Sequence, residues 1–327
     1  MTKLYQAPME GITATIWRNA IAAHFGGIDR YYTPFISPTP GTKLAPKALR
    51  EVDPACNHLN GAPLVPQVMA NDPERFLETA RLLADLGYGE VNINLGCPSG
   101  TVTAKRKGAG MLADPAALQR FLEGVYAAPP LPVSLKVRLG LREPEEFAAL
   151  LEVFNAYPVA ELTVHSRVRE EFYSGTPHWD WFDYARAHAK MPLCANGNLF
   201  TPTEIGQKAA EYPGVPLMLG RGLAADPALA RKAKGGPAAS RQELADFVGE
   251  IEQGCRARLG DRTALFPLKE LWTYLAHSFE NSAEPLHQLA RAKTFTDYRI
   301  AAAAILNGCP LLAESDYHGH GPGTQAK

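Results

Sequence analysis

One stretch of the chain, DPERFLETARLLADLGYGEVNINLGCP at residues 72–98, contains a complete helix–strand unit. The dipeptide Asp72-Pro73 supplies an N-cap and a first-turn proline, and helical periodicity then runs to Leu86. A short apolar, β-rich run follows at Glu90–Asn94. The stretch therefore predicts a helix that leads into a buried strand, which is the repeating unit of an α/β protein.

The same unit recurs through the first two-thirds of the chain. The candidate strands are Leu4–Ala7, Asp29–Phe35, Leu64–Met69, Glu90–Asn94, Val133–Arg138, Glu161–His165, Pro192–Asn196 and Pro216–Gly220. Helical segments lie between them, among them Pro73–Leu86, Pro115–Tyr126, Pro144–Asn155 and Pro202–Tyr212. Strands that alternate with helices indicate parallel βα units, and eight such units predict a closed (β/α)₈ TIM barrel.

The pattern changes after Gly235-Gly236-Pro237, where strand signals end. Helical periodicity dominates residues 240–306, which predicts a small all-α bundle. We therefore expect a barrel domain at 1–236, a helical domain at 237–312 and a glycine-rich, disordered tail at 313–327.

Composition narrows the class of protein. The 327-residue chain has a net charge of −1, which excludes a wholly basic nucleic-acid binder but allows a local basic patch. Its five cysteines are widely spread with no C-x-x-C pair, so we expect neither a disulfide framework nor a metal site. Without a secretory signal or a membrane-length apolar run, we expect a cytoplasmic protein with no membrane contact. No feature points to a protein partner.

Polar residues and glycines follow seven of the predicted strands, at the barrel face where TIM-barrel active sites lie. The last two clusters, around Gly197 and around Gly220-Arg221-Gly222, suit a phosphate, because glycine permits close backbone approach and arginine supplies a forked cation. Lys136 is either ion-paired with a carboxylate or held against the pyrimidine edge of a flavin. His165 is either a core histidine or a ligand contact.

Cys97 lies between Gly96 and Pro98 directly after a strand. Lone cysteines are most often small buried hydrophobic residues. A thiol is also mostly protonated at neutral pH, so Cys97 is a candidate proton donor for reduction of a uracil double bond.

The loop beyond Cys97 carries the basic run Lys105-Arg106-Lys107. Such a run is either a solvated surface or a grip on nucleic-acid phosphates. The sequence contains no dinucleotide-binding G-x-G-x-x-G after a strand and no P-loop, so a nicotinamide donor would have to visit a flavin without a Rossmann domain.

Taken together, the motifs resemble those of the tRNA-dihydrouridine synthase family. The matching segments are Ala7–Gly11, Asn94–Ser99, Val133–Gly140, Asn196-Gly197 and Gly220–Gly222, in the family's order over residues 4–225. The resemblance implies an FMN-binding barrel, NADPH as transient reductant and the tRNA D-loop as substrate. By position it implies FMN contacts from Pro8, Met9, Gln67, Lys136, His165, Asn196, Gly197, Gly220 and Arg221.

The resemblance also implies that Cys97 is the proton donor and that Asn94 lies beside the uracil. We add Arg138, Arg167, Lys105, Arg106 and Lys107 as candidate tRNA contacts. The chain departs from the family pattern at Asn92, at Gly100 and at the basic run, so the position modified in tRNA stays open. Two other functions also stay open: a flavin barrel reductase acting on a small molecule, and a non-catalytic RNA-binding barrel.

Overall fold

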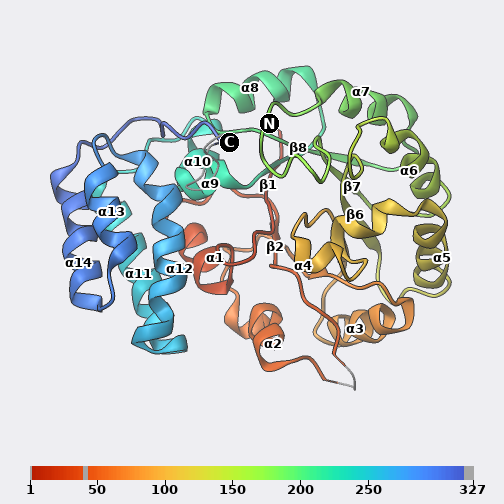
Figure 1. Cartoon of the computed structure of the whole chain (residues 1–327), viewed down its shortest axis with the longest axis horizontal. Helices are drawn as coiled ribbons and strands as arrows, with labels where there is room; N and C mark the ends of the chain where they lie inside the picture. Colours follow the sequence, from red (N-terminus) through yellow and green to blue (C-terminus); the bar gives the residue numbers. More distant parts are fainter. Residues whose placement is uncertain (1, 40–42, 320–327) are drawn as a thin grey trace.

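The computed structural model describes residues 2–39 and 43–319 of the chain. A ring of parallel strands surrounded by helices forms the larger part, and a bundle of helices lies beside it (Figure 1). Within the described residues, no helix has the length and apolar character needed to cross a membrane.

The strands of the ring are short and all parallel. They are β1 (Leu4–Gln6), β2 (Tyr31–Tyr32), β3 (Leu64–Val65), β4 (Gln67–Val68), β5 (Val91–Leu95), β6 (Val133–Arg138), β7 (Leu162–His165), β8 (Leu193–Asn196) and β9 (Leu217–Leu219). Seven of them form one sheet in the order β1-β9-β8-β7-β6-β5-β4, and β2 pairs with β3.

Single parallel bridges close this sheet into a barrel. Tyr5 of β1 pairs with Arg30, just before β2, and Val68 of β4 pairs with Ile36, just after β2. The backbone N–H of Gln6 donates to the Arg30 carbonyl at 2.9 Å. The ring therefore has eight strand positions, which confirms the predicted TIM barrel.

Two predicted strands differ from those observed. The third, Leu64–Met69, is divided by Pro66, which has no N–H to donate. β3 on one side of the proline pairs with β2, and β4 on the other side pairs with β5. The second predicted strand is reduced to the two residues of β2, with single bridges on either side.

The proline-capped helices begin where the sequence indicates. The Asp72 side chain accepts hydrogen bonds from the first turn of α3 (Pro73–Asp85), and Asp114 caps α5 (Pro115–Tyr126) in the same way. Thr201 opens α8 (Pro202–Glu211) with a capping box. The other barrel helices are α1 (Thr15–His24), α2 (Pro46–Val52), α4 (Gly100–Thr103), α6 (Glu146–Asn155), α7 (Trp179–His188), α9 (Arg221–Ala225) and α10 (Leu229–Ala233).

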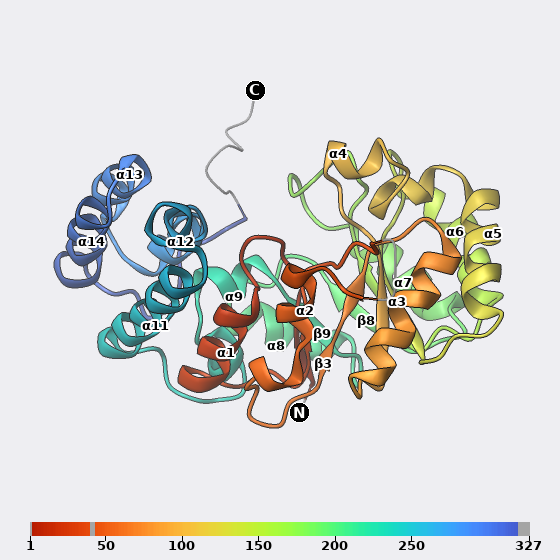
Figure 2. The same ribbon diagram turned by 90° about the horizontal axis from the view of Figure 1, so that it is seen from below.

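The helical bundle consists of α11 (Arg241–Leu259), α12 (Asp261–Leu275), α13 (Ala283–Arg291) and α14 (Phe295–Ala303), which confirms the predicted all-α part. It lies against α1 of the barrel (Figure 2). The rings of Phe25 and Phe247 meet edge to face there, with centroids 5.3 Å apart. A Cβ on Gly254 of α11 would come within 2.8 Å of the Ile16 side chain, so glycine permits this close packing.

The C-terminal segment differs from the expected disordered tail. Residues 313–319 are described, and Tyr317 is buried against Phe200, Tyr274 and His277, with ring centroids 5.1, 5.8 and 5.1 Å away. This aromatic residue anchors a segment whose glycines alone suggested disorder. Residues 320–327 of the expected tail lie outside the described residues.

Candidate active site

A cavity of about 550 Å³ opens at the carboxyl ends of the barrel strands; we call it the mouth cavity. Eight residues that the sequence singled out line it: Pro8, Met9, Gln67, Asn94, Cys97, Lys136, Arg138 and His165. The structure therefore brings together residues from β1, β4, β5, β6 and β7, as expected for a TIM-barrel site.

A ladder of side-chain amides leads from the barrel interior to Cys97. Ser134 Oγ accepts a hydrogen bond from Asn92 Nδ2 at 2.9 Å, and Asn92 Oδ1 accepts from Gln67 Nε2 at 2.8 Å. Gln67 Oε1 accepts from Asn94 Nδ2 at 2.7 Å, and Asn94 Oδ1 accepts from the Cys97 backbone N–H at 2.9 Å. Both ends of the Asn94 amide are thus used to position the Cys97 loop.

The Cys97 thiol lies half-buried in this loop. Burial raises its pKa above the ordinary value, and the nearby Arg138 and Lys136 charges only partly oppose the rise. The thiol therefore stays protonated at neutral pH and is able to donate a proton. Gly108 packs closely against Cys97, because a Cβ on Gly108 would lie only 3.0 Å from Cys97 Cβ. The backbone φ of +55° at Gly108 also favours glycine.

Lys136 extends from β6 into the mouth cavity. Its Nζ donates to Asn196 Oδ1 at 2.9 Å, and Asn196 Nδ2 donates to the Met218 carbonyl at 2.8 Å. Burial, followed by repulsion from Arg138, lowers the lysine pKa to about 7. Within residues 2–39 and 43–319, no carboxylate lies at ion-pair distance from Lys136, so the ion pair considered from the sequence is not observed.

His165, at the end of β7, is buried among cations. Burial first, and then the charges of Arg138, Lys136, Arg167 and Arg221, hold its pKa well below the usual range. The imidazole is therefore neutral at physiological pH. A convergence of four cations on one neutral histidine makes this part of the mouth cavity suited to an anion.

The two arginines predicted to bind substrate are held by loop carbonyls. Arg138 donates to the Gly96 and Val168 carbonyls, each at 2.9 Å. Arg167 donates to the Ser174 and Gly175 carbonyls at 3.0 and 2.6 Å, and it does not line the mouth cavity. These bonds fix the loops on either side of the cavity.

Arg221, at the start of α9, is similarly held. Its Nη1 donates to the Gly319 carbonyl at 2.7 Å, and its Nη2 donates to Asn198 Oδ1 at 3.1 Å. The Tyr173 ring lies over the guanidinium, 4.4 Å from centroid to Cζ. Of the guanidinium hydrogens, Nε–H and one hydrogen on Nη2 have no partner among the described residues.

The glycines predicted to cradle a phosphate serve different purposes. A Cβ on Gly197 would lie 2.5 Å from the Trp179 ring, and one on Gly222 would lie 2.3 Å from the Leu199 carbonyl. Protein packing therefore occupies the space that we expected for a phosphate at these two residues. At Gly220 the nearest atoms are in Ala7 and Met9, at 3.4 and 3.5 Å. Of these three glycines, Gly220 alone leaves room for a phosphate to approach the backbone closely.

Lys105 and Arg106 of the basic run are exposed and Lys107 is half-buried, and none of the three lines the mouth cavity. It follows α4, which lies at the upper end of the barrel in Figure 2. The run is tied to the active-site loop, because the Ala109 N–H donates to the Cys97 carbonyl at 3.1 Å. It thus borders the cavity without entering it.

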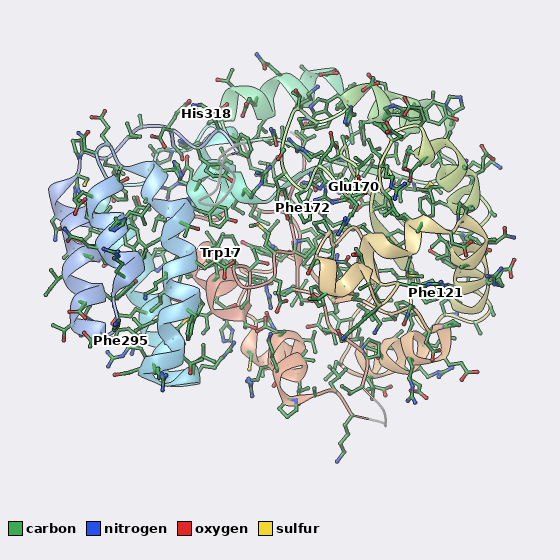
Figure 3. All side chains as sticks on the ribbon, in the orientation of Figure 1. Trp17, Phe121, Glu170, Phe172, Phe295 and His318 are labelled. Atoms are coloured by element: carbon green, nitrogen blue, oxygen red, sulfur yellow. The ribbon has the colours of Figure 1, made fainter. Side chains whose placement is uncertain are left out.

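Sequence reasoning missed several residues of the cavity wall. Phe172 and Tyr173 come from the loop after β7, and Phe172 lies over the centre of the barrel (Figure 3). Glu270 and Tyr274 come from α12 of the helical bundle, and burial together with the Glu10 charge raises the Glu270 pKa. Because Glu270 and Tyr274 are four residues apart, both side chains lie on one face of α12. No sequence signal indicated that this face meets the barrel.

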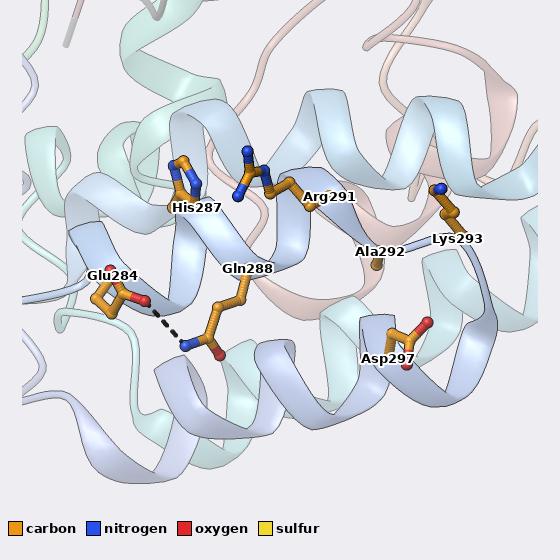
Figure 4. Close-up of a pocket in the computed structure, with 7 residues that line it drawn as sticks. All are labelled: Glu284, His287, Gln288, Arg291, Ala292, Lys293 and Asp297. Carbon is orange, nitrogen blue, oxygen red and sulfur yellow. Dashed lines mark hydrogen bonds between the residues drawn. The ribbon is translucent and has the colours of Figure 1, made fainter.

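A hollow of about 510 Å³ lies on the surface between α13 and α14 (Figure 4). It is lined by Glu284, His287, Gln288, Arg291, Ala292, Lys293 and Asp297. Gln288 Nε2 donates to Glu284 Oε1 at 3.0 Å, and the charges are of both signs. The hollow is open and polar, and none of its residues lines the mouth cavity. In the part of the chain that the structure describes, no group of three or more His, Cys, Asp and Glu residues is placed to hold a metal ion.

Comparison with known proteins identifies relatives along most of the chain. The family model "Dihydrouridine synthase (Dus)" matches residues 5–298. The tRNA-dihydrouridine(16) synthase of Pseudomonas putida is 30% identical over 301 residues, which are 87% of this chain and 91% of that protein. The protein of the same name from Ralstonia nicotianae is 29% identical over 89% of this chain and 92% of its own length.

Among solved structures, a complex of 2-naphthoyl-CoA reductase with 2-naphthoyl-CoA superposes with a TM-score of 0.54. The match covers 72% of this chain and 50% of that chain, at 12% sequence identity. At this identity the likeness concerns the fold alone.

Proposed function

The chain belongs to the dihydrouridine synthase family, and we propose that it reduces the C5–C6 double bond of a uridine in tRNA to give dihydrouridine. Its relatives carry the name tRNA-dihydrouridine(16) synthase, so we propose position 16 as the target. The observation that carries the proposal is the Cys97 thiol, kept protonated by burial and held in the mouth cavity by the Asn94 amide.

FMN is the proposed cofactor, and it supplies the hydride when it is bound and reduced. The cavity fits this group, because Lys136, neutral His165 and the surrounding arginines offer donors and positive charge. Pro8, Met9 and Gln67 would contact the flavin from the strand ends. Asn196 would act by holding Lys136, and Gly197 by packing against Trp179.

The phosphate of FMN would lie towards Gly220 and Arg221, where a backbone without a Cβ meets a fixed cation. The chain has no separate dinucleotide motif, so we propose that NADPH reduces the flavin by entering the same cavity and leaving it. NADPH and tRNA would then use the same opening in turn.

The chain's own residues contribute proton transfer and charge stabilisation. The Cys97 Sγ–H donates its proton to one carbon of the uracil ring while the other carbon receives the hydride, and solvent restores the thiol proton. The Lys136 ammonium stabilises negative charge that develops beside it. Asn94 and Arg138 are positioning residues, since both are bonded to the Cys97 loop.

Binding of tRNA is proposed to involve Lys105, Arg106 and Lys107 at the cavity rim and the bundle cations Arg291 and Lys293 (Figure 4). Each phosphate contact that is lost should lower the slope of log K against log salt by about 0.7–0.9. Replacing Lys105–Lys107 with glutamine should therefore weaken tRNA binding and flatten its salt dependence, while FMN content is unchanged. An identical salt titration for the variant would show that the run is only a solvated surface.

The function is tested by incubating flavin-loaded protein with NADPH and an unmodified tRNA transcript, and then mapping dihydrouridine. We expect dihydrouridine at position 16. Flavin-loaded protein that forms no dihydrouridine in any tRNA, but reduces a free pyrimidine or an enoyl substrate, would support the small-molecule alternative. Protein that binds tRNA but no flavin would support the non-catalytic alternative.

A further inference from the structure

A second cavity, of about 580 Å³, adjoins the mouth cavity; we call it the interdomain pocket. Its walls come from α1, the segment after β2, α2 and the bundle helices α11 and α12. Trp17, which lines it, lies on α1 at the side of the barrel that faces the bundle (Figure 3). The function described above leaves this pocket without a role.

The walls of the interdomain pocket are mainly apolar. The apolar lining includes Ile16 and Trp17 of α1, Ile251 of α11 and Leu271 of α12. Phe35 adds a half-buried aromatic ring between the two cavities. Such a lining suits the flat faces of a nucleobase, which bind by stacking and apolar contact.

The interdomain pocket and the mouth cavity share part of their walls. Glu10, Ile12 and Phe35 line both. A strand of RNA that places one base in the mouth cavity therefore has the interdomain pocket beside it. Extruding a base unstacks its neighbour, which is then free to seek another apolar surface.

Basic side chains lie at the rim of the interdomain pocket. Lys47 and Arg50 are exposed on α2, three residues apart, and both line the pocket. Lys47 Nζ lies 3.0 Å from Glu10 Oε1, whereas no carboxylate among the described residues lies at ion-pair distance from Arg50. Arg258 of α11 forms an ion pair with the buried Glu51, with 3.4 Å between Nη1 and Oε1. The rim charges complement the phosphates that link adjacent nucleotides.

We propose that the interdomain pocket receives the base next to the target uridine, so that the enzyme holds two unstacked nucleotides of the tRNA loop at once. This inference rests on the proposed function and adds a second base site to it. The occupant is a base of RNA, because the pocket shares a wall with the proposed uridine site and its rim is cationic.

The first test uses the protein unchanged. Binding of intact tRNA is compared with binding of two tRNAs that are abasic at the nucleotide on one or the other side of position 16. We expect one of the two to bind about tenfold more weakly, within the range for losing one stacked base. Equal affinity for all three overturns the second base site, and formation of dihydrouridine in the intact tRNA shows that the proposed function still stands.

The second test fills the pocket. Ala48→Trp places an indole in it from α2, and Leu49→Trp is the matched control, because Leu49 is the exposed neighbour and does not line the pocket. We expect Ala48→Trp to bind intact tRNA about tenfold more weakly and to lose nothing further with the abasic tRNA, while Leu49→Trp behaves as the unchanged protein. If Ala48→Trp keeps the full abasic effect, the base lies elsewhere and the proposal fails.

A third measurement tests whether the interdomain pocket binds RNA or the nicotinamide donor. The rate at which NADPH reduces the bound flavin is measured without tRNA for both tryptophan variants. We expect unchanged rates. A slower reduction in Ala48→Trp together with unaltered tRNA affinity would assign the pocket to the dinucleotide and overturn the proposal.

Discussion

The two sides of the barrel mouth carry similarly polar sequences but use them differently. On the β5–β6 side, Asn94, Cys97 and Lys136 face the mouth cavity, supported from behind by the amide ladder. On the β7–β9 side, Arg167 and Arg221 are bonded to loop carbonyls and to the C-terminal segment. A polar residue at a strand end therefore acquires its role from the loops that cover it, and strand position alone does not assign it.

The two sides also differ in what they offer a ligand. The β5–β6 side presents the Cys97 thiol, the proposed proton donor, whose pKa is raised by burial. The β7–β9 side presents cations already fixed in direction, which lose little further freedom when they meet an anion. We therefore expect substitutions at Asn94 and Cys97 on the first side to affect the uridine step, and substitutions around Arg221 on the second to affect the cofactor.

The largest effect is expected at Cys97. In Cys97→Ala, FMN binding and reduction by NADPH should persist, whereas oxidation of the reduced flavin by tRNA should slow by about a hundredfold, as for a lost general acid. Stopped-flow traces of the two half-reactions measure this. Cys56→Ala is the control, since Cys56 does not line the mouth cavity. If Cys97→Ala is oxidised by tRNA at the normal rate, Cys97 is a structural cysteine.

A smaller effect is expected when the Cys97 loop is loosened. Asn94→Ala removes the acceptor for the Cys97 N–H and the donor to Gln67. Turnover on tRNA should fall by about tenfold through misplacement of the thiol, and stability by about 1–3 kcal/mol. Asn198→Ala, on the β7–β9 side, should instead weaken FMN binding, because Asn198 accepts from Arg221. Identical kinetic profiles for the two variants would remove the distinction between the sides.

The C-terminal segment should influence the cofactor alone. Tyr317→Ala removes the anchor that holds Gly319 against Arg221, so FMN should dissociate roughly fivefold faster, the factor for about 1 kcal/mol. Tyr317→Phe should change little, because the Tyr317 hydroxyl lies 3.4 Å from Arg221 Nη1, long for a hydrogen bond. Flavin release followed by fluorescence measures both. An unaltered release rate in Tyr317→Ala would show that the segment has no part in holding the cofactor.

The smallest effect is expected in the stability of the flavin-free protein. The folded-state pKa of Lys136 is lowered from 10.5 to about 7, so the unfolded chain binds more protons between these values. The resulting penalty to folding is fully present below about pH 7 and disappears as pH rises towards 10.5. Lys136→Met should therefore raise Tm at pH 6.5 and have less effect on Tm at pH 9.5.

Thermal unfolding at the two pH values measures the effect of Lys136. Lys105→Met, at an exposed lysine, is the control and should show no such dependence on pH. A Lys136→Met variant that is less stable than the unchanged protein at pH 6.5 would show that the lysine stabilises the fold.

Local sequence patterns were enough to predict the alternation of strands and helices, the starts of α3, α5 and α8, and the place of Cys97 after a strand. These features depend on neighbours within a few residues, because periodicity and capping are local. The residues of the β5–β6 side belong to the same class, since strand ends in a barrel converge on one face.

How these parts meet depends on contacts between segments that are distant in the chain. Single bridges close the ring at β2, Trp179 fills the space beside Gly197, and Glu270 reaches the mouth cavity from the bundle. The hydrogen bond from Arg221 to Gly319 joins residues 98 positions apart. Such contacts form when distant segments pack together and bury apolar surface. A local sequence pattern does not specify which distant segments will meet.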